Sequence, residues 1–318
     1  MQQRTAYVFL TFMALFFGGT WVAGKVGVDA IPPITLAAGR FGIASILLWL
    51  WARTKRRAPN PSGASGSGPS GRPPRLSDLP LFLGMGLTAI AGYNMLFLYG
   101  LTLAPASDGA IIVPGLAPIL TAVLAALILR ERIGRWGIAG LVTAVAGLLL
   151  VLTPGEAQSR ARFLGDLLFL GGAVCWAFYS VIGKTATTRF HPVNATLYGT
   201  VTGTLLLIPP AIAERGWTQL AAAPPAAWIG LLYLAVFGTV LAFVFFYEGV
   251  RRIGAARATS FAFLVPMFGV VSSVLLLGER IAPPTIIGGA LVLVGLWLVQ
   301  RQPAVSPATT VHAEPVEG

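Results

Sequence analysis

GAIIVPGLAPILTAVLAALILRERI, residues 109–133, returns later in the chain as RATSFAFLVPMFGVVSSVLLLGERI, residues 257–281. At an offset of 148 residues Pro118 aligns with Pro266, and both copies end in Glu-Arg-Ile. An apolar run of about 20 residues is long enough to cross the hydrocarbon core of a bilayer. Each copy therefore predicts a membrane-spanning helix with a charged end, and a repeated span predicts a larger duplicated unit.

The likeness extends through most of the chain. Glycines and aromatic residues on both sides of the stretch align at the same offset, which becomes 159 residues near the start of each copy. A polar segment present in the first half alone accounts for the change. The predicted organisation is a first repeat over 1–153, with a cytoplasmic linker at 53–78, a second repeat over 163–301, and a disordered cytoplasmic tail over 302–318.

Composition places the protein in a membrane. Of the 318 residues 56% are hydrophobic and 10% are charged, and the mean hydropathy is +0.79. Soluble domains carry about 25% charged residues. This balance excludes an ordinary soluble domain. The single cysteine, Cys175, excludes an intrachain disulfide and is interpreted as a small packing residue.

Apolar segments occur ten times, each near the length of a spanning helix. They cover about 7–28, 33–52, 79–99, 105–128, 134–152, 164–187, 194–213, 226–247, 255–277 and 282–300. Five spans per repeat is an odd number, so the two repeats enter the membrane from opposite sides. The predicted fold is therefore all-α and integral to the membrane, with ten transmembrane helices as two inverted five-helix repeats, an architecture common in secondary transporters.

The basic residues predict the orientation. With the N-terminus in the cytoplasm, 15 Lys and Arg residues lie on the cytoplasmic side and 4 on the other. Both termini are then cytoplasmic, and the net charge of +11 needs no nucleic-acid partner. The chain lacks a phosphate-binding glycine loop, and neither of its two histidines belongs to a cluster of ligands. No cofactor and no metal site are expected.

Arg40 stands out as a charge about eight residues into the second span. At that depth an arginine costs at least ~2.5 kcal/mol on insertion scales, so it should face protein or water. It either attracts a substrate carboxylate or pins helix-end carbonyls. Its counterpart in the second repeat is Gly199, so the symmetry of the fold does not require the charge, which favours a role in function.

Aromatic and amide side chains are the other candidates for a central cavity, because they combine apolar faces with polar edges. The candidates are Trp21, Tyr93, Asn94, Trp176 and Tyr179. Contact with lipid or an interfacial aromatic belt is the alternative for the rings.

Further residues suggest gating. Lys25 and Lys184 are equivalent in the two repeats and either reach to the interface or share a gate. Glu131 and Glu279 are interpreted as helix-end ion pairs with neighbouring arginines, with proton carriage as the alternative. Pro118 and Pro266 interrupt their helices mid-span and are candidate hinges or static kinks. Asp108 opens the fourth span as an acid favoured by the helix dipole, with proton coupling as an alternative.

The paired spans, each with a proline in the fourth helix and a Glu-Arg-Ile ending, resemble the EamA-like family of the drug/metabolite transporter superfamily. GGTWVAGK in the first span and the stretch from Trp176 to Lys184 support the resemblance, which covers about residues 7–300. It implies a carrier of the bacterial inner membrane with a cavity lined by both halves. The expected activity is export of small amphipathic metabolites such as amino acids, their derivatives or drugs, and not an enzymatic reaction.

The remaining partners and alternatives follow from the same residues. The protein is expected to meet a small-molecule substrate and the lipid bilayer, with protons as a candidate coupling ion. A nucleotide-sugar or sugar-phosphate carrier would require more basic residues in the cavity. An intramembrane enzyme or lipid-modifying protein would require a buried polar cluster that reaches a lipid head group.

Overall fold

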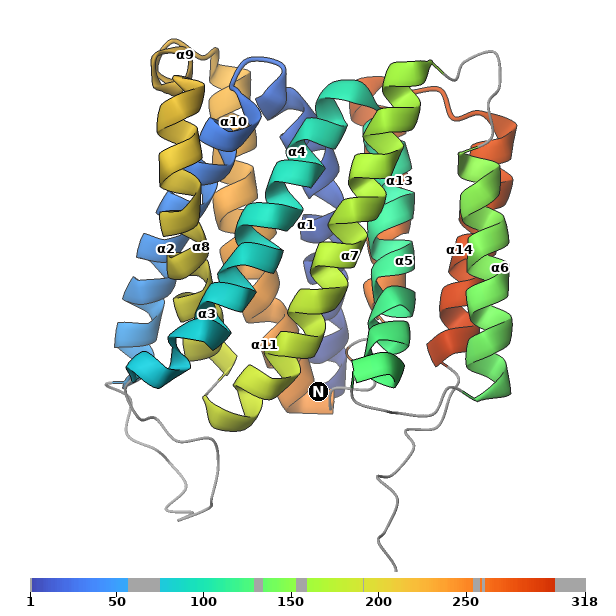
Figure 1. The fold of residues 1–318 in the computed structure, drawn as a ribbon, viewed down its shortest axis with the longest axis horizontal. Coiled ribbons are helices and arrows are strands. Elements are labelled where there is room, and N and C mark those ends of the chain that lie inside the picture. Colours follow the sequence, from blue (N-terminus) through green and yellow to red (C-terminus); the bar gives the residue numbers. More distant parts are fainter. Residues whose placement is uncertain are drawn as a thin grey trace, which may run out of the picture.

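The protein is a bundle of helices in the computed structural model, which describes residues 2–56, 75–128, 134–152, 159–190, 192–253, 258 and 261–300 (Figure 1). The described part contains no β-strand. Its longer helices are α1 (Gln2–Val28), α2 (Pro33–Arg56), α3 (Leu79–Met85), α4 (Tyr93–Leu103), α5 (Ala106–Ile128), α6 (Arg135–Val151), α7 (Arg160–Arg189), α8 (Pro192–Glu214), α10 (Pro225–Ala235), α11 (Ala242–Ile253), α13 (Leu264–Leu277) and α14 (Pro283–Gln300). Short turns are η1 (Leu76–Asp78), α9 (Trp217–Ala221) and η4 (Phe261–Phe263).

Two of the helices contain a π-helical segment. In the first, η2 (Gly86–Gly92) joins α3 to α4, and in the second, η3 (Val236–Leu241) joins α10 to α11. The sequence predicts these two regions as single spans of one kind of helix, and nothing in its apolar pattern signals the wider turns. A π turn leaves a backbone carbonyl without its usual partner and is frequent at functional sites.

The helices have the length and apolarity of membrane spans. Within the described residues, eight are long and apolar enough to cross a bilayer, and the apolar helices Arg135–Val151 and Phe261–Leu277 are shorter. Several helices begin at a proline, among them α2, α8, α10 and α14. Proline favours this position because the first N–H of a helix has no intrahelical partner. The protein is thus an all-helical membrane protein, with helix boundaries close to those expected.

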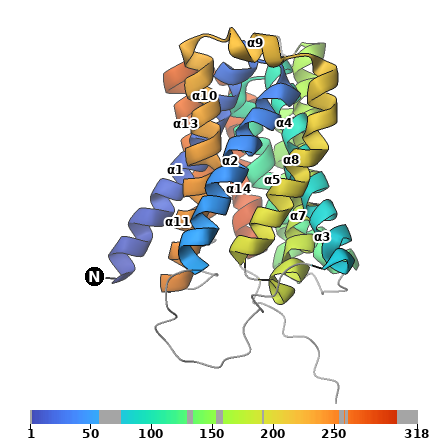
Figure 2. The same ribbon diagram turned by 90° about the vertical axis from the view of Figure 1, so that its left-hand side faces the viewer.

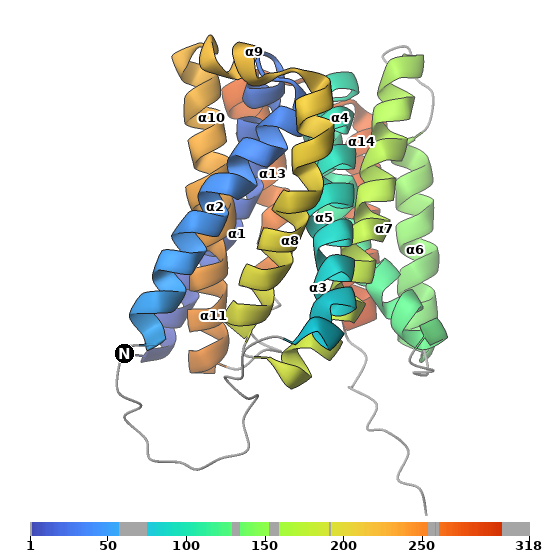
Figure 3. The same cartoon turned by 60° about the vertical axis from the view of Figure 1, so that its left-hand side comes forward.

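Helices from the two ends of the sequence pack against each other. The main pairs include α1 with α13, α5 with α7, α2 with α8, and α6 with α14. In each pair one helix precedes residue 153 and the other follows residue 159. In the order of the repeats α1 corresponds to α7, α2 to α8, α5 to α13 and α6 to α14. Exchanging corresponding helices turns the α1–α13 pair into the α7–α5 pair, and it leaves the α2–α8 and α6–α14 pairs unchanged. Figures 2 and 3 show α2 beside α8, and Figures 1 and 3 show α6 beside α14 at one edge.

The α6–α14 contact depends on four glycines. A Cβ on Gly147 would lie 2.5 Å from the carbonyl oxygen of Gly288, and one on Gly140 would lie 2.5 Å from that of Gly295. Glycine lets the two backbones approach this closely, as is common between membrane helices. We call this contact the glycine seam. At the offset of 148 residues Gly140 aligns with Gly288 and Gly147 with Gly295, and in space they pair the other way, Gly140 with Gly295 and Gly147 with Gly288.

Candidate functional site

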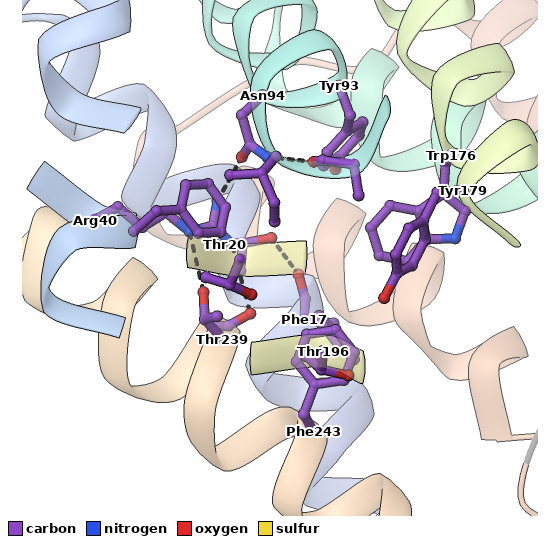
Figure 4. Close-up of a pocket in the computed structure, with 15 residues that line it drawn as sticks. Phe17, Thr20, Arg40, Tyr93, Asn94, Trp176, Tyr179, Thr196, Thr239 and Phe243 are labelled. Carbon is purple, nitrogen blue, oxygen red and sulfur yellow. Dashed lines mark hydrogen bonds between the residues drawn. The ribbon is translucent and has the colours of Figure 1, made fainter. Parts of the chain in front are cut away.

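A polar cavity lies inside the bundle (Figure 4). Its volume is about 70 Å³. Helices of both halves line it, namely α1, α2 and α4 from the first and α7, α8 and α11 from the second, together with the π segments η2 and η3. The lining residues are Phe17, Thr20, Arg40, Phe41, Ala89, Ile90, Tyr93, Asn94, Trp176, Tyr179, Thr196, Thr200, Gly238, Thr239 and Phe243.

Arg40 lies at the centre of the polar contacts and is 7% exposed. Its Nη1 donates to Asn94 Oδ1 at 3.0 Å, and its Nε donates to Thr239 Oγ1 at 3.2 Å. A longer contact of 3.5 Å runs from Nη2 to the carbonyl oxygen of Gly238, and the guanidinium lies 4.8 Å from the centre of the Phe41 ring. Since α2 and α4 belong to the first half and η3 to the second, Arg40 connects the two halves with neutral acceptors alone.

The π segments explain why Asn94 and Thr239 reach the arginine. The Asn94 side-chain amide donates to the Ala89 carbonyl, five residues earlier, at 2.8 Å. The Thr239 hydroxyl likewise donates to the Leu234 carbonyl, also five residues earlier, at 2.9 Å. Each side chain satisfies a carbonyl next to a π turn and turns its oxygen toward Arg40. The two wide turns therefore fix the acceptors of the buried cation.

Aromatic rings form the opposite wall, as Figure 4 shows. The Tyr93 and Trp176 rings meet edge to face with their centres 5.2 Å apart, and the Trp176 and Tyr179 rings are 5.5 Å apart. Tyr93 also stacks on Phe97 at 5.7 Å. Such contacts hold large rings in fixed positions. The cavity thus has a cationic side and an aromatic side.

Five of the six residues predicted for the cavity lie together in its lining: Arg40, Tyr93, Asn94, Trp176 and Tyr179. Trp21 does not line it. Its ring is 2% exposed and packs edge to face on Phe97 and Phe169 at 4.9 and 5.7 Å. A Cβ on Gly109 would collide with this ring, so Gly109 provides the space for it. Trp21 is a core residue because the neighbouring helices enclose it completely.

Sequence reasoning missed several lining residues. The threonines at 20, 196, 200 and 239 and the phenylalanines at 17, 41 and 243 were not among the expected candidates. Threonine and phenylalanine occur on lipid-facing and cavity-facing surfaces alike. One sequence signal could have found Phe17, because at the offset of 159 residues between the repeats it aligns with Trp176.

The two candidate hinge prolines differ in position. Pro118 lies inside α5, which also contains Pro114, so both remove hydrogen bonds from a continuous helix. Pro266 is not mid-helix. It lies in the first turn of α13, directly after the turn η4, where the missing N–H costs little. The two prolines align in the sequence, but α5 begins 12 residues before Pro118 and α13 begins two residues before Pro266. The two prolines therefore occupy different positions in their helices.

Glu279 ties the second half of the chain to the first. Gly278, with a left-handed φ of 68°, ends α13 and turns the chain so that Glu279 meets the start of α5. Its carboxylate accepts from the backbone N–H groups of Ala106 and Ser107 at 2.7 and 2.9 Å. Among the described residues Glu279 forms no ion pair with Arg280. The expected helix-end ion pair is replaced by a cap that Glu279 provides at the start of α5.

Glu214 makes a second contact of the same kind. Its carboxylate accepts from the backbone N–H groups of Ile34 and Thr35 at 3.2 and 2.7 Å and from the Thr35 hydroxyl at 2.8 Å. These groups belong to the first turn of α2. The Tyr99 hydroxyl donates to the same carboxylate at 3.2 Å. Glu214 and Glu279 therefore each join the end of a helix from the second half to the start of a helix from the first.

The same end of the bundle holds two further polar contacts. Asp108, in the first turn of α5, receives two hydrogen bonds from Arg162, 2.7 Å from Nε and 3.0 Å from Nη2. Lys25 Nζ donates to the Leu101 carbonyl near the end of α4 at 2.6 Å. We call the contacts of Glu214, Glu279, Asp108–Arg162 and Lys25 the closing layer. It belongs to the end of the bundle where α4 ends and α5 begins, which is the upper end in Figure 1.

The remaining gate candidates are elsewhere. Lys184 is exposed near the end of α7, away from the closing layer, although the sequence alignment pairs it with Lys25. Glu131 lies outside the described residues. Glu248, which lies outside these contacts, pairs with Arg252 one turn later on α11 at 2.7 Å.

A second hollow is larger but lacks the chemistry of the first. It measures about 280 Å³ and lies between α5, α13 and α14, where Ile111, Met267, Val271, Ile286 and Leu293 are among its lining residues. Every lining side chain is apolar. A lipid tail suits such a groove, whereas recognition of a polar solute requires the groups around Arg40.

Fold and site together define a polytopic membrane protein with a polar cavity buried between its two halves. The sequence model of the EamA-like transporter family matches residues 4–153 and matches again over residues 163–301. The chain belongs to the EamA-like transporter family.

Individual relatives agree with this assignment. The uncharacterized transporter YyaM of Bacillus subtilis is 29% identical over 93% of this chain and 93% of its own length. A probable terminal-alkyne amino-acid exporter of Streptantibioticus cattleyicolor is 29% identical over 89% and 90% of the two chains. The uncharacterized inner membrane transporter YedA of Escherichia coli is 25% identical over 92% of each.

A crystal structure shares the fold. It superposes with a TM-score of 0.57 at 20% identity and covers 93% of this chain and 96% of its own. The helical bundle is thus similar to a known arrangement along nearly its full length.

Proposed function

We propose that the protein is a secondary transporter that exports small amphipathic metabolites, amino acids or their derivatives and drugs among them, by alternating access. The observation that carries the proposal is the cavity of Figure 4, which both halves line and which has a buried cation on one side and aromatic rings on the other. Such a lining suits a solute with one polar end and one apolar end. Membership of a transporter family and the description of the Streptantibioticus relative as a probable amino-acid exporter support export of this class of solute.

The proposed architecture is ten transmembrane helices in two inverted repeats, about 1–153 and 163–301. The 17-residue helix α6 is about 26 Å long, which is close to the hydrocarbon thickness of a bilayer. Two observations support the repeat. The helix contacts of one half correspond to those of the other, and the family model matches the chain twice. Two equivalent halves of opposite direction can exchange conformations, and this would move the opening of the cavity from one side to the other.

The proposed location is the bacterial inner membrane with both termini in the cytoplasm, because Lys and Arg residues gather on that side. Helix α1 begins and α14 ends at the same end of the bundle, opposite the closing layer (Figure 1). In this orientation the closing layer faces the exterior. The structure then represents a state that is sealed on the outside by Glu214, Glu279 and the Asp108–Arg162 pair.

The cavity must widen to take a solute. Its volume of about 70 Å³ is well below that of ligand pockets, which hold roughly 300–1,000 Å³. The contact of Arg40 to Thr239 holds the walls together across the boundary between the halves, and its contact to Asn94 holds α2 to α4. A solute that takes over these donors would separate the walls, and its release would let them close again.

Transport by the purified full-length protein tests the proposal. The protein is reconstituted into liposomes, and efflux of radiolabelled amino acids, amino-acid derivatives and cationic drugs is measured with and without a pH gradient. Carrier activity predicts saturable efflux that liposomes without protein lack. Dependence on the gradient would identify protons as the coupling ion. Absence of saturable flux for every solute class would refute the proposed function.

A further inference from the structure

The charge of the cavity is unbalanced. Among its described lining residues Arg40 is the one charged side chain, and neither aspartate nor glutamate lines the cavity. The partners of its guanidinium are an amide oxygen, a hydroxyl, a backbone carbonyl and an aromatic ring. Arginine stays protonated in proteins. The site therefore holds one positive charge that no carboxylate among the described lining residues neutralises.

Burial of this charge makes the site favour anionic solutes over cationic ones. Arg40 is 7% exposed, and a charge taken out of water is costly unless a counter-charge approaches it. A bound anion would supply that counter-charge. A bound ammonium group would add a second positive charge to a cavity whose other polar groups are neutral: hydroxyls, the Asn94 amide, the Trp176 indole and the Gly238 carbonyl. The two kinds of solute therefore gain very different electrostatic energies from the same site.

The geometry leaves two N–H donors of the arginine for an anion. A guanidinium has five N–H donors. Three of its contacts go to the described acceptors of Asn94, Thr239 and Gly238, and the last of these is long at 3.5 Å. The remaining donors match the two oxygens of a carboxylate, which arginine binds side by side. Across the cavity the Tyr93–Trp176–Tyr179 wall offers flat apolar surface to the rest of the molecule.

From this arrangement we infer that the transported class is a small organic monoanion with an apolar or aromatic body and no free ammonium group, such as a carboxylic acid or an N-acylated amino acid. Arg40 determines this charge preference by binding the carboxylate. The inference rests on the proposed transport function and narrows it. A free zwitterionic amino acid is disfavoured because its ammonium group would lie close to Arg40 without a carboxylate to pair with.

Compounds that share a skeleton test the charge preference directly on the full-length protein. One series is 3-phenylpropionate, N-acetylphenylalanine, phenylalanine, 3-phenylpropanamide and phenethylamine, and a second series replaces the phenyl ring by an isobutyl group. Binding is measured by thermal stabilisation in detergent, and flux is measured in liposomes. The anions of at least one series are expected to bind and cross at least tenfold better than the zwitterion, amide and amine of the same skeleton.

The outcomes separate the inference from the proposed function. Flux of the zwitterion, amide or amine that equals that of the matched anion overturns the anion inference and leaves transport standing. Binding without flux for every compound overturns the transport function, and the substrate assignment with it. Neither binding nor flux of any anion in either series also overturns the inference.

Variants of Arg40 add a second test. Arg40→Lys keeps the charge, whereas Arg40→Gln removes it and leaves a neutral amide on a shorter side chain. The anion preference should survive in part in the lysine variant and fall to less than threefold in the glutamine variant. An unchanged preference in folded Arg40→Gln protein would contradict the role of this residue. The wild-type series remains decisive where a variant does not fold.

Discussion

Glu279 offers a direct test of how the closing layer works. Its carboxylate accepts two backbone hydrogen bonds at the start of α5, at 2.7 and 2.9 Å. Glu279→Gln keeps the side-chain length and one acceptor oxygen but removes the charge and one of the two bonds. A hydrogen bond to a charged group contributes about 1.5–3 kcal/mol, compared with about 0.5–1.5 kcal/mol for a neutral one. Partial exposure of Glu279 places the expected loss at about 1–2 kcal/mol.

That loss should raise the population of molecules open at this end by roughly 5–30-fold. Ser107 is a suitable reporter position because it is 2% exposed beneath the Glu279 carboxylate. A Ser107→Cys substitution in a Cys175→Ala background places the only thiol there and retains the backbone N–H that Glu279 binds. A membrane-impermeant maleimide then reacts only when the layer opens, so the labelling rate follows the open population.

The expected result is a labelling rate about 5–30-fold higher in the Glu279→Gln protein than in its parent. Glu248→Gln serves as the matched control, since Glu248 pairs with Arg252 on α11 and lies outside the closing layer. This variant should label at the parental rate. Equal rates for Glu279→Gln and the parent, in folded protein, would show that the carboxylate does not hold this end closed.

Three other substitutions give distinct results. Arg40→Ala should lower saturable efflux more than tenfold while the yield of folded protein, measured by size-exclusion chromatography, stays the same; unchanged efflux would reject a role for Arg40 in binding. Gly147→Ala should destabilise the protein by about 1–3 kcal/mol, because its Cβ would lie 2.5 Å from a carbonyl oxygen on α14. Gly42→Ala is its control, since no atom lies within 4 Å of a Cβ there, and thermal unfolding in detergent should separate the two variants. Asp108→Asn should cost about 3 kcal/mol because Arg162, 13% exposed, loses its charged partner, and a thermal midpoint equal to that of the wild type would contradict this.

The helix positions could be predicted from the sequence because lipid imposes a simple requirement on length and apolarity. The sequence could not predict which face of each helix points toward the cavity. In a soluble protein polar residues mark the outer face, but in a membrane the lipid-facing surface is as apolar as the packed interior. Arg40 and Asn94 were recognisable because a charge or amide at that depth requires a polar partner.

Trp21 shows the limit of this reasoning. It has the same residue type as Trp176 and, like Trp176, precedes a Gly-Lys pair, but by three residues instead of seven. Trp176 lines the cavity, whereas Trp21 fills the core. Trp21 is in the core because Gly109, on a neighbouring helix, has no side chain and leaves space for the ring. That space depends on how two helices pack and is not visible in the sequence. The π turns beside Asn94 and Thr239 were equally invisible, because they depend on how a helix is accommodated among its neighbours.

The glycine seam sets an order of events during biosynthesis. Helix α6 ends at Val151, and its glycine-lined surface has no partner until α14, ending at Gln300, leaves the ribosome. At about 5–20 residues per second, the roughly 150 residues between them take about 7–30 s to translate. During that interval the small, flat face of α6 is open to other helices in the membrane. A chain truncated before α14 should keep that face open permanently and become a preferred target of membrane quality control.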